Sequence, residues 1–149
     1  MKEVILIVDD DPIILSTMNK VLSSYYKVRA ANSGMRALEV IMTEPKPELI
    51  LLDVLMPKMN GFDVLEKLRD NKDTKDIPVI FVTGLKGEND EEKGIALGAV
   101  DYISKPISPI ILLARVKNHL TLKQAKDFLI DKNSFLEEEI ARRLEENKN

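Results

Sequence analysis

The chain has 149 residues, a length that predicts one domain. Hydrophobic residues make up 44% of it and charged residues 32%, so it can bury a core and stay in solution. Its 22 Lys and Arg against 25 Asp and Glu give a net charge of −3, which argues against binding to nucleic acid or to an anionic membrane. The absence of Cys and the single His exclude a disulfide framework, a thiolate zinc site and a multi-histidine metal centre built from this chain alone.

Short apolar runs alternate with longer segments of helical period. Taken in chain order, the pattern predicts strands at 4–8, 27–30, 49–52, 79–82 and 102–104, and helices at 12–24, 33–43, 62–69, 90–97 and from 109 onward. The runs at 4–8, 49–52 and 79–82 are almost continuously apolar, which is typical of parallel strands that are covered on both faces. The other two fit edge strands. This alternation predicts an open, doubly wound α/β sheet.

Local signals support several boundaries. Asp11 and Ser108 each precede a proline, an arrangement typical of a helix cap followed by the first helical residue. Asn60-Gly61 is followed by a helical pattern, so we interpret it as a strand-to-helix loop and not as a hairpin. From Pro109 the helical pattern continues for some 40 residues without Gly or Pro, far beyond an ordinary globular helix.

No apolar run is long enough for a signal-peptide core or a membrane span. The run at the N-terminus, Val4–Val8, has five residues, and nothing approaches the 18 or so that a span requires. We therefore expect a cytoplasmic location, and the lack of Cys agrees with a reducing compartment.

Acidic, hydroxyl and basic residues follow the predicted strands. Because ligands bind at the carboxyl ends of the strands in such a sheet, we expect these side chains at one rim: Asp9, Asp10 and Asp11 after the first strand, Asp53 after the third, Thr83 after the fourth and Lys105-Pro106 after the fifth. A single Asp after a strand is usually a cap or a loop residue, and we expect no more of Asp11. Asp53 lies between two apolar segments, so burial should raise its pKa unless a cation compensates. The cluster predicts a Mg²⁺ site.

A carboxylate at such a site can act as a nucleophile and form an aspartyl-phosphate. A metal ion, a hydroxyl and a lysine would neutralise the oxygens of the transferring phosphoryl group. The sequence contains no GxxxxGK[ST] and no GxGxxG after a strand, so we expect the phosphoryl donor to be another molecule.

Ordered segments from about Val4 to Leu120 resemble the receiver domains of bacterial two-component response regulators. ILIVDDDP resembles the segment with the acidic pair, LLDVLMPKMNGFD the phosphoacceptor segment, VTG the segment with the hydroxyl, and GAVDYISKPI the segment with the switch aromatic and the Lys-Pro pair. The spacings agree with the family: 43 residues from Asp10 to Asp53, 30 from Asp53 to Thr83 and 22 from Thr83 to Lys105.

The resemblance implies a flavodoxin-like strand order of 2-1-3-4-5 and a role for each matching residue. It implies that Asp53 accepts a phosphoryl group from a phosphohistidine on a sensor histidine kinase or phosphotransfer protein. It also implies that Mg²⁺ is held by Asp9, Asp10, Asp53 and the backbone carbonyl of Leu55, with Asp9 acting through a water. Lys105 is implied to pair with Asp53, and Thr83, Gly84 and Lys105 to bind the phosphoryl group. Thr83 and Tyr102 are implied to form a switch, and the peptide bond before Pro106 to be cis.

Some positions depart from the family pattern. Gly84 stands where the family most often has Ala, which predicts open access to Asp53. Gly94 lowers the propensity of its helix, and we favour a packing requirement over a labile output surface. Leu55 and Leu85 lie two residues beyond Asp53 and Thr83, and because neither can orient a water, we predict slow self-dephosphorylation.

The resemblance implies a receiver at 1–121, which leaves 122–149 as a helical linker. Placing Leu122, Leu129 and Leu136 at d puts Lys126, Asn133 and Ile140 at a, and this heptad pattern favours a parallel homodimer through a two-stranded coiled coil. Arg143 breaks the d series, and Phe128 and Phe135 widen the stripe, so packing on another domain is the alternative. We expect a solvated tail at 144–149.

The segment RVKNHLTLKQAKDFLIDKNSFLEEEIARRLEE, residues 115–146, resembles the linker to HD-GYP phosphodiesterases in some relatives. The chain has neither an HD dyad nor a GYP motif, so we expect any such output enzyme beyond Asn149. His119 is expected to be an ordinary exposed residue, with a phosphotransfer histidine as the alternative.

We therefore predict a signalling module that is not itself an enzyme and relays kinase activity through dimer geometry. The rivals are a Mg²⁺-dependent aspartyl-phosphate hydrolase and a coiled-coil adaptor with a degenerate receiver.

Overall fold

The computed structural model describes residues 2–84 and 88–146 of the chain. Strands and helices alternate within these residues, and each predicted element is present with a boundary shift of at most two residues. In chain order they are β1 (Val4–Val8), α1 (Pro12–Leu22), β2 (Lys27–Ala31), α2 (Gly34–Ile41), β3 (Leu49–Leu52), α3 (Gly61–Arg69), β4 (Val79–Thr83), α4 (Glu88–Ala96), β5 (Asp101–Ser104) and α5 (Pro109–Glu146).

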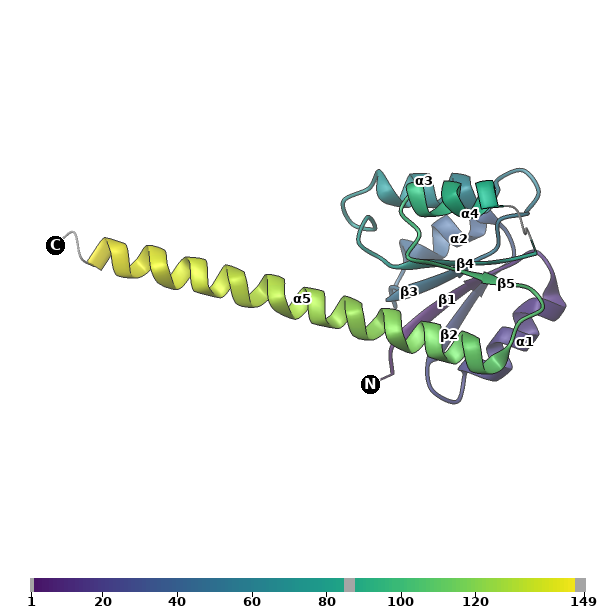
Figure 1. Ribbon diagram of the computed structural model, residues 1–149, viewed down its shortest axis with the longest axis horizontal. Helices are drawn as coiled ribbons and strands as arrows, with labels where there is room; N and C mark the ends of the chain where they lie inside the picture. Colours follow the sequence, from purple (N-terminus) through teal and green to yellow (C-terminus); the bar gives the residue numbers. More distant parts are fainter. Residues whose placement is uncertain (1, 85–87, 147–149) are drawn as a thin grey trace.

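The strands form one parallel sheet in the order β2-β1-β3-β4-β5 (Figure 1). This is the predicted doubly wound order. The apolar runs β1, β3 and β4 are buried along their whole length, whereas the edge strands β2 and β5 are partly exposed. The strand ends that carry Asp9, Asp53 and Thr83 therefore lie on adjacent strands in the middle of the sheet.

Helices cover both faces of the sheet, with α2, α3 and α4 on one side and α1 and α5 on the other (Figure 1). Side chains alternate along each strand, so successive residues of β1 enter different cores. Leu6 and Val8 pack in the core beneath α2 and α3, while Ile5 and Ile7 pack in the core beneath α1 and α5. This two-sided burial explains why β1 is apolar throughout.

Side-chain caps begin the helices near the carboxyl ends of the strands. Asp11 caps α1 by accepting a hydrogen bond from the Ile13 N–H at 2.9 Å, as predicted. Asn60 caps α3 and forms a reciprocal capping box with Asp63. Asn60-Gly61 is thus a strand-to-helix junction, which confirms its interpretation.

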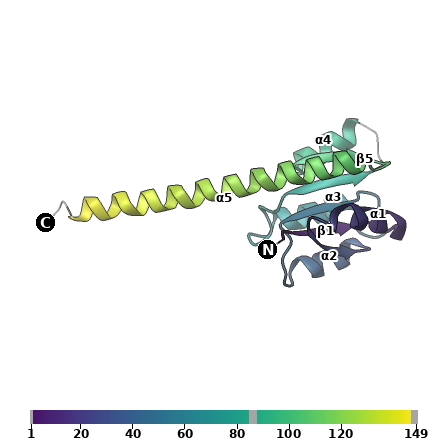
Figure 2. The ribbon, with the colours of Figure 1, turned by 90° about the horizontal axis from the view of Figure 1, so that it is seen from below.

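Helix α5 has 38 residues, about 57 Å at 1.5 Å per residue. Leu112, Val116 and Leu120 are buried against the sheet, and the part of the helix that follows them projects beyond it (Figures 1 and 2). It leaves the body at the edge where the parallel strands begin, opposite the edge where they end. Among the described residues, no helix combines the length and the apolar character that a membrane span requires.

Candidate functional site

Three carboxylates meet at the carboxyl edge of the sheet. Asp9 and Asp10 follow β1 and Asp53 follows β3, and one oxygen from each lies within 4.8 Å of the others. Asp9 and Asp53 are only 1% and 4% exposed, whereas Asp10 is open to solvent. The strand pairing that places β1 beside β3 therefore creates the predicted acidic cluster.

Lys105 and Thr83 complete this rim. The Lys105 ammonium lies 2.7 Å from a carboxylate oxygen of Asp9 and 3.6 Å from one of Asp53. The fully buried Thr83 hydroxyl and the backbone N–H of Leu55 both donate hydrogen bonds to the Asp53 carboxylate. The resemblance implies a pair between Lys105 and Asp53, and in the structure the shorter contact of Lys105 is with Asp9.

The electrostatics of the rim favour a bound cation. Burial raises the pKa of Asp53, and the neighbouring charge of Asp9 raises it further, against the opposing effects of Lys105 and Thr83. Burial lowers the pKa of Lys105, but the hydrogen bond from its ammonium to Asp9 and the charges of Asp53 and Asp9 raise it overall. One ammonium thus faces three carboxylates, and this oxygen donor set fits a hard divalent ion such as Mg²⁺.

Gly61 is a site residue that sequence reasoning did not single out. A Cβ atom at this position would lie 2.3 Å from the backbone carbonyl oxygen of Asp53, so only glycine lets α3 begin this close to the strand end. The Asn60-Gly61 pair carried the signal, but a sequence does not show which backbone the glycine approaches.

The remaining predicted site residues that the structure describes lie on or just after β4 and β5. Tyr102 is half-buried on β5, with its ring edge-on to Phe81 at 6.4 Å between centroids. The peptide bond between Lys105 and Pro106 is cis, as the resemblance implies, and a second cis bond joins Glu44 and Pro45. Gly84 is exposed and has no heavy atom within 4 Å of the position a Cβ would take. Leu85 lies outside the described residues.

One interpretation of His119 is wrong. Its ring is half-buried, and Nε2 lies 2.9 Å from an Asp101 carboxylate oxygen that also accepts from Arg115 at 2.7 Å. The side chain therefore joins α5 to the start of β5 and is not an ordinary exposed residue. Heptad spacing does not show this contact because its partner is 18 residues away on a strand.

The residues of the predicted dimer helix lie apart from this site. Leu122, Leu129, Asn133, Leu136 and Ile140 are all exposed on the projecting part of α5.

The model of the response regulator receiver domain family matches residues 5–117. The chain belongs to the response regulator receiver domain family. This match covers the acidic cluster, Thr83, Tyr102 and Lys105, and receivers are signalling domains that are phosphorylated on an aspartate.

Relatives of the receiver extend well beyond this chain. It is 46% identical over 139 residues to a Vibrio cholerae protein named as a probable cyclic di-GMP phosphodiesterase, covering 93% of this chain and 31% of that protein. It is 40% identical over 126 residues to the response regulator PleD of Caulobacter vibrioides, covering 84% of this chain and 28% of PleD. The chain thus spans about a third of the length of these two relatives.

Solved receiver structures agree with the fold. A CheY-like receiver domain protein from Methanospirillum hungatei superimposes with a TM-score of 0.77 at 31% identity, covering 85% of this chain and 99% of that one. The activated receiver domain of DrrB gives a TM-score of 0.73 at 32% identity, covering 81% and 99%.

Proposed function

We propose that Asp53 is the phosphoacceptor of this receiver and that its donor is a phosphohistidine on a sensor histidine kinase or phosphotransfer protein. The observation that carries the proposal is the position of Asp53, which contacts both Thr83 and Lys105. An oxygen of Asp53 forms a bond to phosphorus as the phosphorus–nitrogen bond breaks. The imidazole of the donor keeps the electron pair and takes up a proton.

The other residues of the rim act on the charge of the phosphoryl group. We infer that the carboxylates of Asp9, Asp10 and Asp53, with the Leu55 carbonyl, hold Mg²⁺, with Asp9 acting through a water. The ion supplies positive charge beside the transferring oxygens. The Lys105 ammonium, the Thr83 hydroxyl and the backbone of Gly84 bind the phosphoryl oxygens, since all three border Asp53 or follow the strand beside it.

We infer that the signal leaves through the surface formed by 83–106 and through α5. Thr83 already contacts Asp53, and Tyr102 lies on the neighbouring strand β5. The added phosphoryl charge draws the Thr83 hydroxyl toward it, and Tyr102 follows into the vacated space.

Residues 1–121 form the receiver and 122–149 the linker to an output domain or a downstream protein. We propose that two copies pair in parallel through Leu122, Leu129, Asn133, Leu136 and Ile140, whose exposure on a free helix supports a coiled coil. The Vibrio relative is named for a phosphodiesterase activity, which we place in an output domain outside this chain. We also propose that this regulator is located in the cytoplasm.

Intact mass after incubation with acetyl phosphate and Mg²⁺ tests the acceptor. We expect a stoichiometric phosphoryl adduct that Asp53→Asn abolishes and that the matched exposed-acid variant Asp73→Asn retains. Rapid turnover without an adduct would indicate an aspartyl-phosphate hydrolase, and neither adduct nor turnover would indicate an adaptor. Phosphatases of that class carry a second Asp two residues after the nucleophile, where this chain has Leu55, so we expect a slow decay that Leu55→Asn accelerates.

Light scattering tests the dimer. Leu129 and Phe128 are adjacent on α5 and almost equally exposed, at 58% and 64%, but only Leu129 lies on the proposed seam. We expect Leu129→Lys to give monomers and Phe128→Lys to leave dimers, while the reverse result would place the contact on the phenylalanine stripe.

A further inference from the structure

A pocket of about 450 Å³ lies between α5 and the loops that precede β4 and β5. This volume is in the range of small-molecule sites. Its walls come from separate segments: the end of α3, the 75–78 loop, the residues before β5 and the stretch of α5 that leaves the body. Its charged and titratable lining residues are Arg69, Lys75, Asp76, His119, Lys123 and Lys126.

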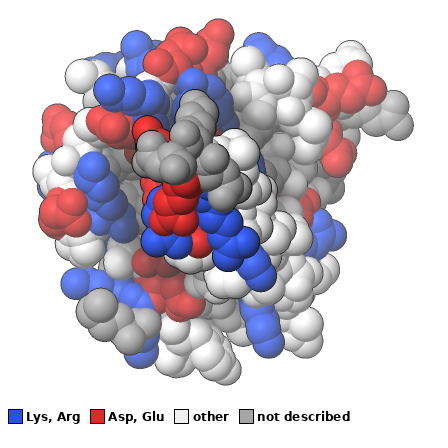
Figure 3. All heavy atoms as spheres, turned by 90° about the vertical axis from the view of Figure 1, so that its left-hand side faces the viewer, with Lys and Arg blue, Asp and Glu red and all other residues white. Residues whose placement is uncertain are grey.

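The lining is basic although the chain is acidic. Four Lys and Arg against one Asp give the pocket a formal charge of +3 with His119 neutral, whereas the whole chain carries −3. Asp127 pairs with Lys123 at 2.7 Å, and counting it still leaves +2. Figure 3 shows the end of the molecule from which α5 projects, where Lys and Arg side chains and Asp and Glu side chains both lie around the helix.

Arg69 contributes a charge that is influenced by the nearby charge of Asp76 but forms no ion pair within 4.0 Å among the described residues. Its guanidinium is half-buried and donates hydrogen bonds to the backbone carbonyls of Lys75, Ile77 and Gly98 at 2.8–3.0 Å. Among residues 2–84 and 88–146, no ion pair within 4.0 Å joins Arg69, Lys75 or Lys126 to a carboxylate. These backbone carbonyls accept the hydrogen bonds of the guanidinium but do not neutralise its positive charge. Partial burial strengthens the electric field of that charge.

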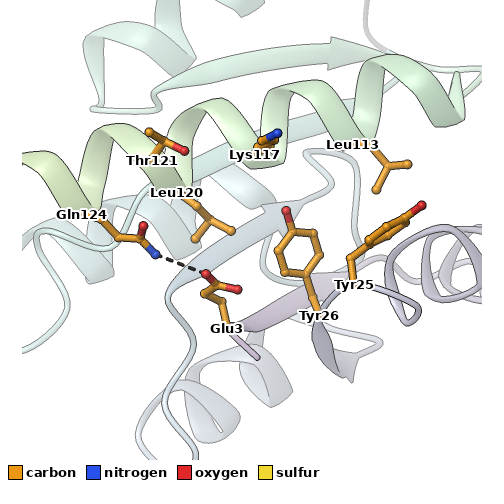
Figure 4. A pocket seen from close by; sticks show the side chains of 8 residues that line it. All are labelled: Glu3, Tyr25, Tyr26, Leu113, Lys117, Leu120, Thr121 and Gln124. Atoms are coloured by element: carbon orange, nitrogen blue, oxygen red, sulfur yellow. Dashed lines mark hydrogen bonds between the residues drawn. The ribbon is translucent and has the colours of Figure 1, made fainter. Parts of the chain in front are cut away.

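A second pocket of similar size, about 410 Å³, provides an internal contrast (Figure 4). It lies beside another face of α5, against Tyr25 and Tyr26, and its charged lining residues are Glu3 and Lys117, which cancel. Glu3 is further engaged by the side chain of Gln124, at 3.3 Å. That pocket offers no net attraction to an anion.

We propose that the basic pocket binds a small molecule that carries several phosphate groups. Lys75 and Lys126 reach the phosphates from opposite walls, and Arg69 and Lys123 add charge between them. The apolar side chain of Val100, exposed at the same pocket, can cover a ring attached to the phosphates. Such a ligand bridges the loop before β4 and α5, and so holds the projecting helix against the body. This site does not depend on the role proposed for Asp53.

Calorimetric titration of the whole chain at low ionic strength tests the site. EDTA is present throughout, so that a metal ion at the acidic rim cannot contribute. Sodium tripolyphosphate probes phosphate charge alone, and GTP probes the same charge with a ring attached. We expect saturable binding of one anion per chain that weakens as salt is added. Tighter binding of GTP would assign the apolar wall to the ring, and equal binding would assign recognition to the phosphates.

Three glutamine variants locate the binding. We expect Lys75→Gln and Lys126→Gln each to weaken binding by about threefold to fivefold, as for one exposed charge contact. Lys117→Gln, which removes the same charge from the pocket beside Tyr26, should leave binding unchanged. Absence of saturable binding of either probe overturns the proposal, and so does an equal loss in all three variants. Lys75 is an exposed loop residue and Lys126 an exposed residue of α5, so the variants are expected to fold.

Discussion

Replacing Gly94 with Ala measures how tightly α4 packs on the sheet. A Cβ atom at Gly94 would lie 2.9 Å from two carbons of the Phe81 ring and 3.7 Å from the ring of Phe62. Phe81 is fully buried and packs edge-on against Phe62, with ring centroids 5.4 Å apart, so it cannot move away without disturbing the core. This contact supports the packing explanation for a glycine inside α4.

Two opposing terms set the size of the effect. Alanine is favoured over glycine inside a helix by about 1 kcal/mol. Adding a methyl group to a filled core costs about 1–3 kcal/mol. We therefore expect Gly94→Ala to lower the free energy of unfolding by about 1 kcal/mol, because the overpacking cost exceeds the helix gain.

Equilibrium unfolding in urea measures this difference, and the chain offers a matched control. Gly84 has no heavy atom within 4 Å of an added Cβ, so Gly84→Ala should change the free energy of unfolding by no more than about 0.5 kcal/mol. If Gly94→Ala proves as stable as the parent protein or more stable, the close packing of α4 on Phe81 is refuted, and the glycine has another purpose.

Four other predictions concern charged side chains and the Mg²⁺ ion. Burial and the charge of Asp9 raise the pKa of Asp53. As the pH rises above the ordinary pKa of an Asp, the ionised Asp53 carboxylate therefore lowers the stability of the folded protein. Asp53→Asn should raise the melting temperature of the metal-free protein at pH 7. Mg²⁺ should stabilise the parent protein and lose most of this effect in Asp53→Asn. Burial alone would raise the pKa of Asp101, but the hydrogen bonds from Arg115 and His119 lower it overall. The ionised Asp101 therefore stabilises the folded protein fully above the pKa of the unfolded chain, about 3.9. This contribution is lost as the pH falls through the lower pKa of the folded protein. Asp101→Asn should therefore destabilise the protein at pH 7, by about 1–3 kcal/mol, and flatten the loss of stability below pH 4. Arg29 donates to the carbonyls of Val40, Thr43 and Pro45 at the end of α2, and Arg29→Met should cost about 1–3 kcal/mol.

Each of these has a control or a contrary outcome. For the Asp53 prediction, a melting temperature that falls in metal-free Asp53→Asn would show that the buried carboxylate is stabilised in place. A stability curve of Asp101→Asn that parallels the parent below pH 4 would separate this carboxylate from acid unfolding. Arg36→Met removes only an exposed ion pair with Glu39, and should change stability by less than about 0.5 kcal/mol in the same urea assay.

The sequence predicts the sheet and its acidic rim because both depend on local signals. An unbroken apolar run such as Leu49–Leu52 is typical of a strand covered on both faces, and an acid that directly follows such a strand lies at its carboxyl end. Side-chain contacts between residues that are distant in the sequence are not predicted by such local signals. Whether Lys105 lies nearer Asp9 or Asp53 depends on a difference of 0.9 Å between two distances, and no spacing pattern encodes it.

The same limit applies to α5. Its length and its apolar positions follow from helical periodicity, but the pairing of His119 with Asp101 requires the orientation of the helix against β5. The basic pocket likewise combines Arg69 and Lys75 with residues of α5 about 50 positions later in the chain, and these meet only after the sheet has formed.

A longer part of α5 lies beyond the sheet than against it, so a small shift of the packed part becomes a larger shift at the far end. Eight residues separate Leu112 from Leu120, about 12 Å of helix in contact with the sheet, and 26 more extend from Leu120 to Glu146, about 39 Å beyond it. A lateral shift of about 1 Å at Leu112, the scale of helix displacements in regulated proteins, pivots the helix about Leu120 and moves its far end by about 3 Å. In this geometry a shift of about 1 Å in the packed part of α5 corresponds to a displacement of about 3 Å at Glu146.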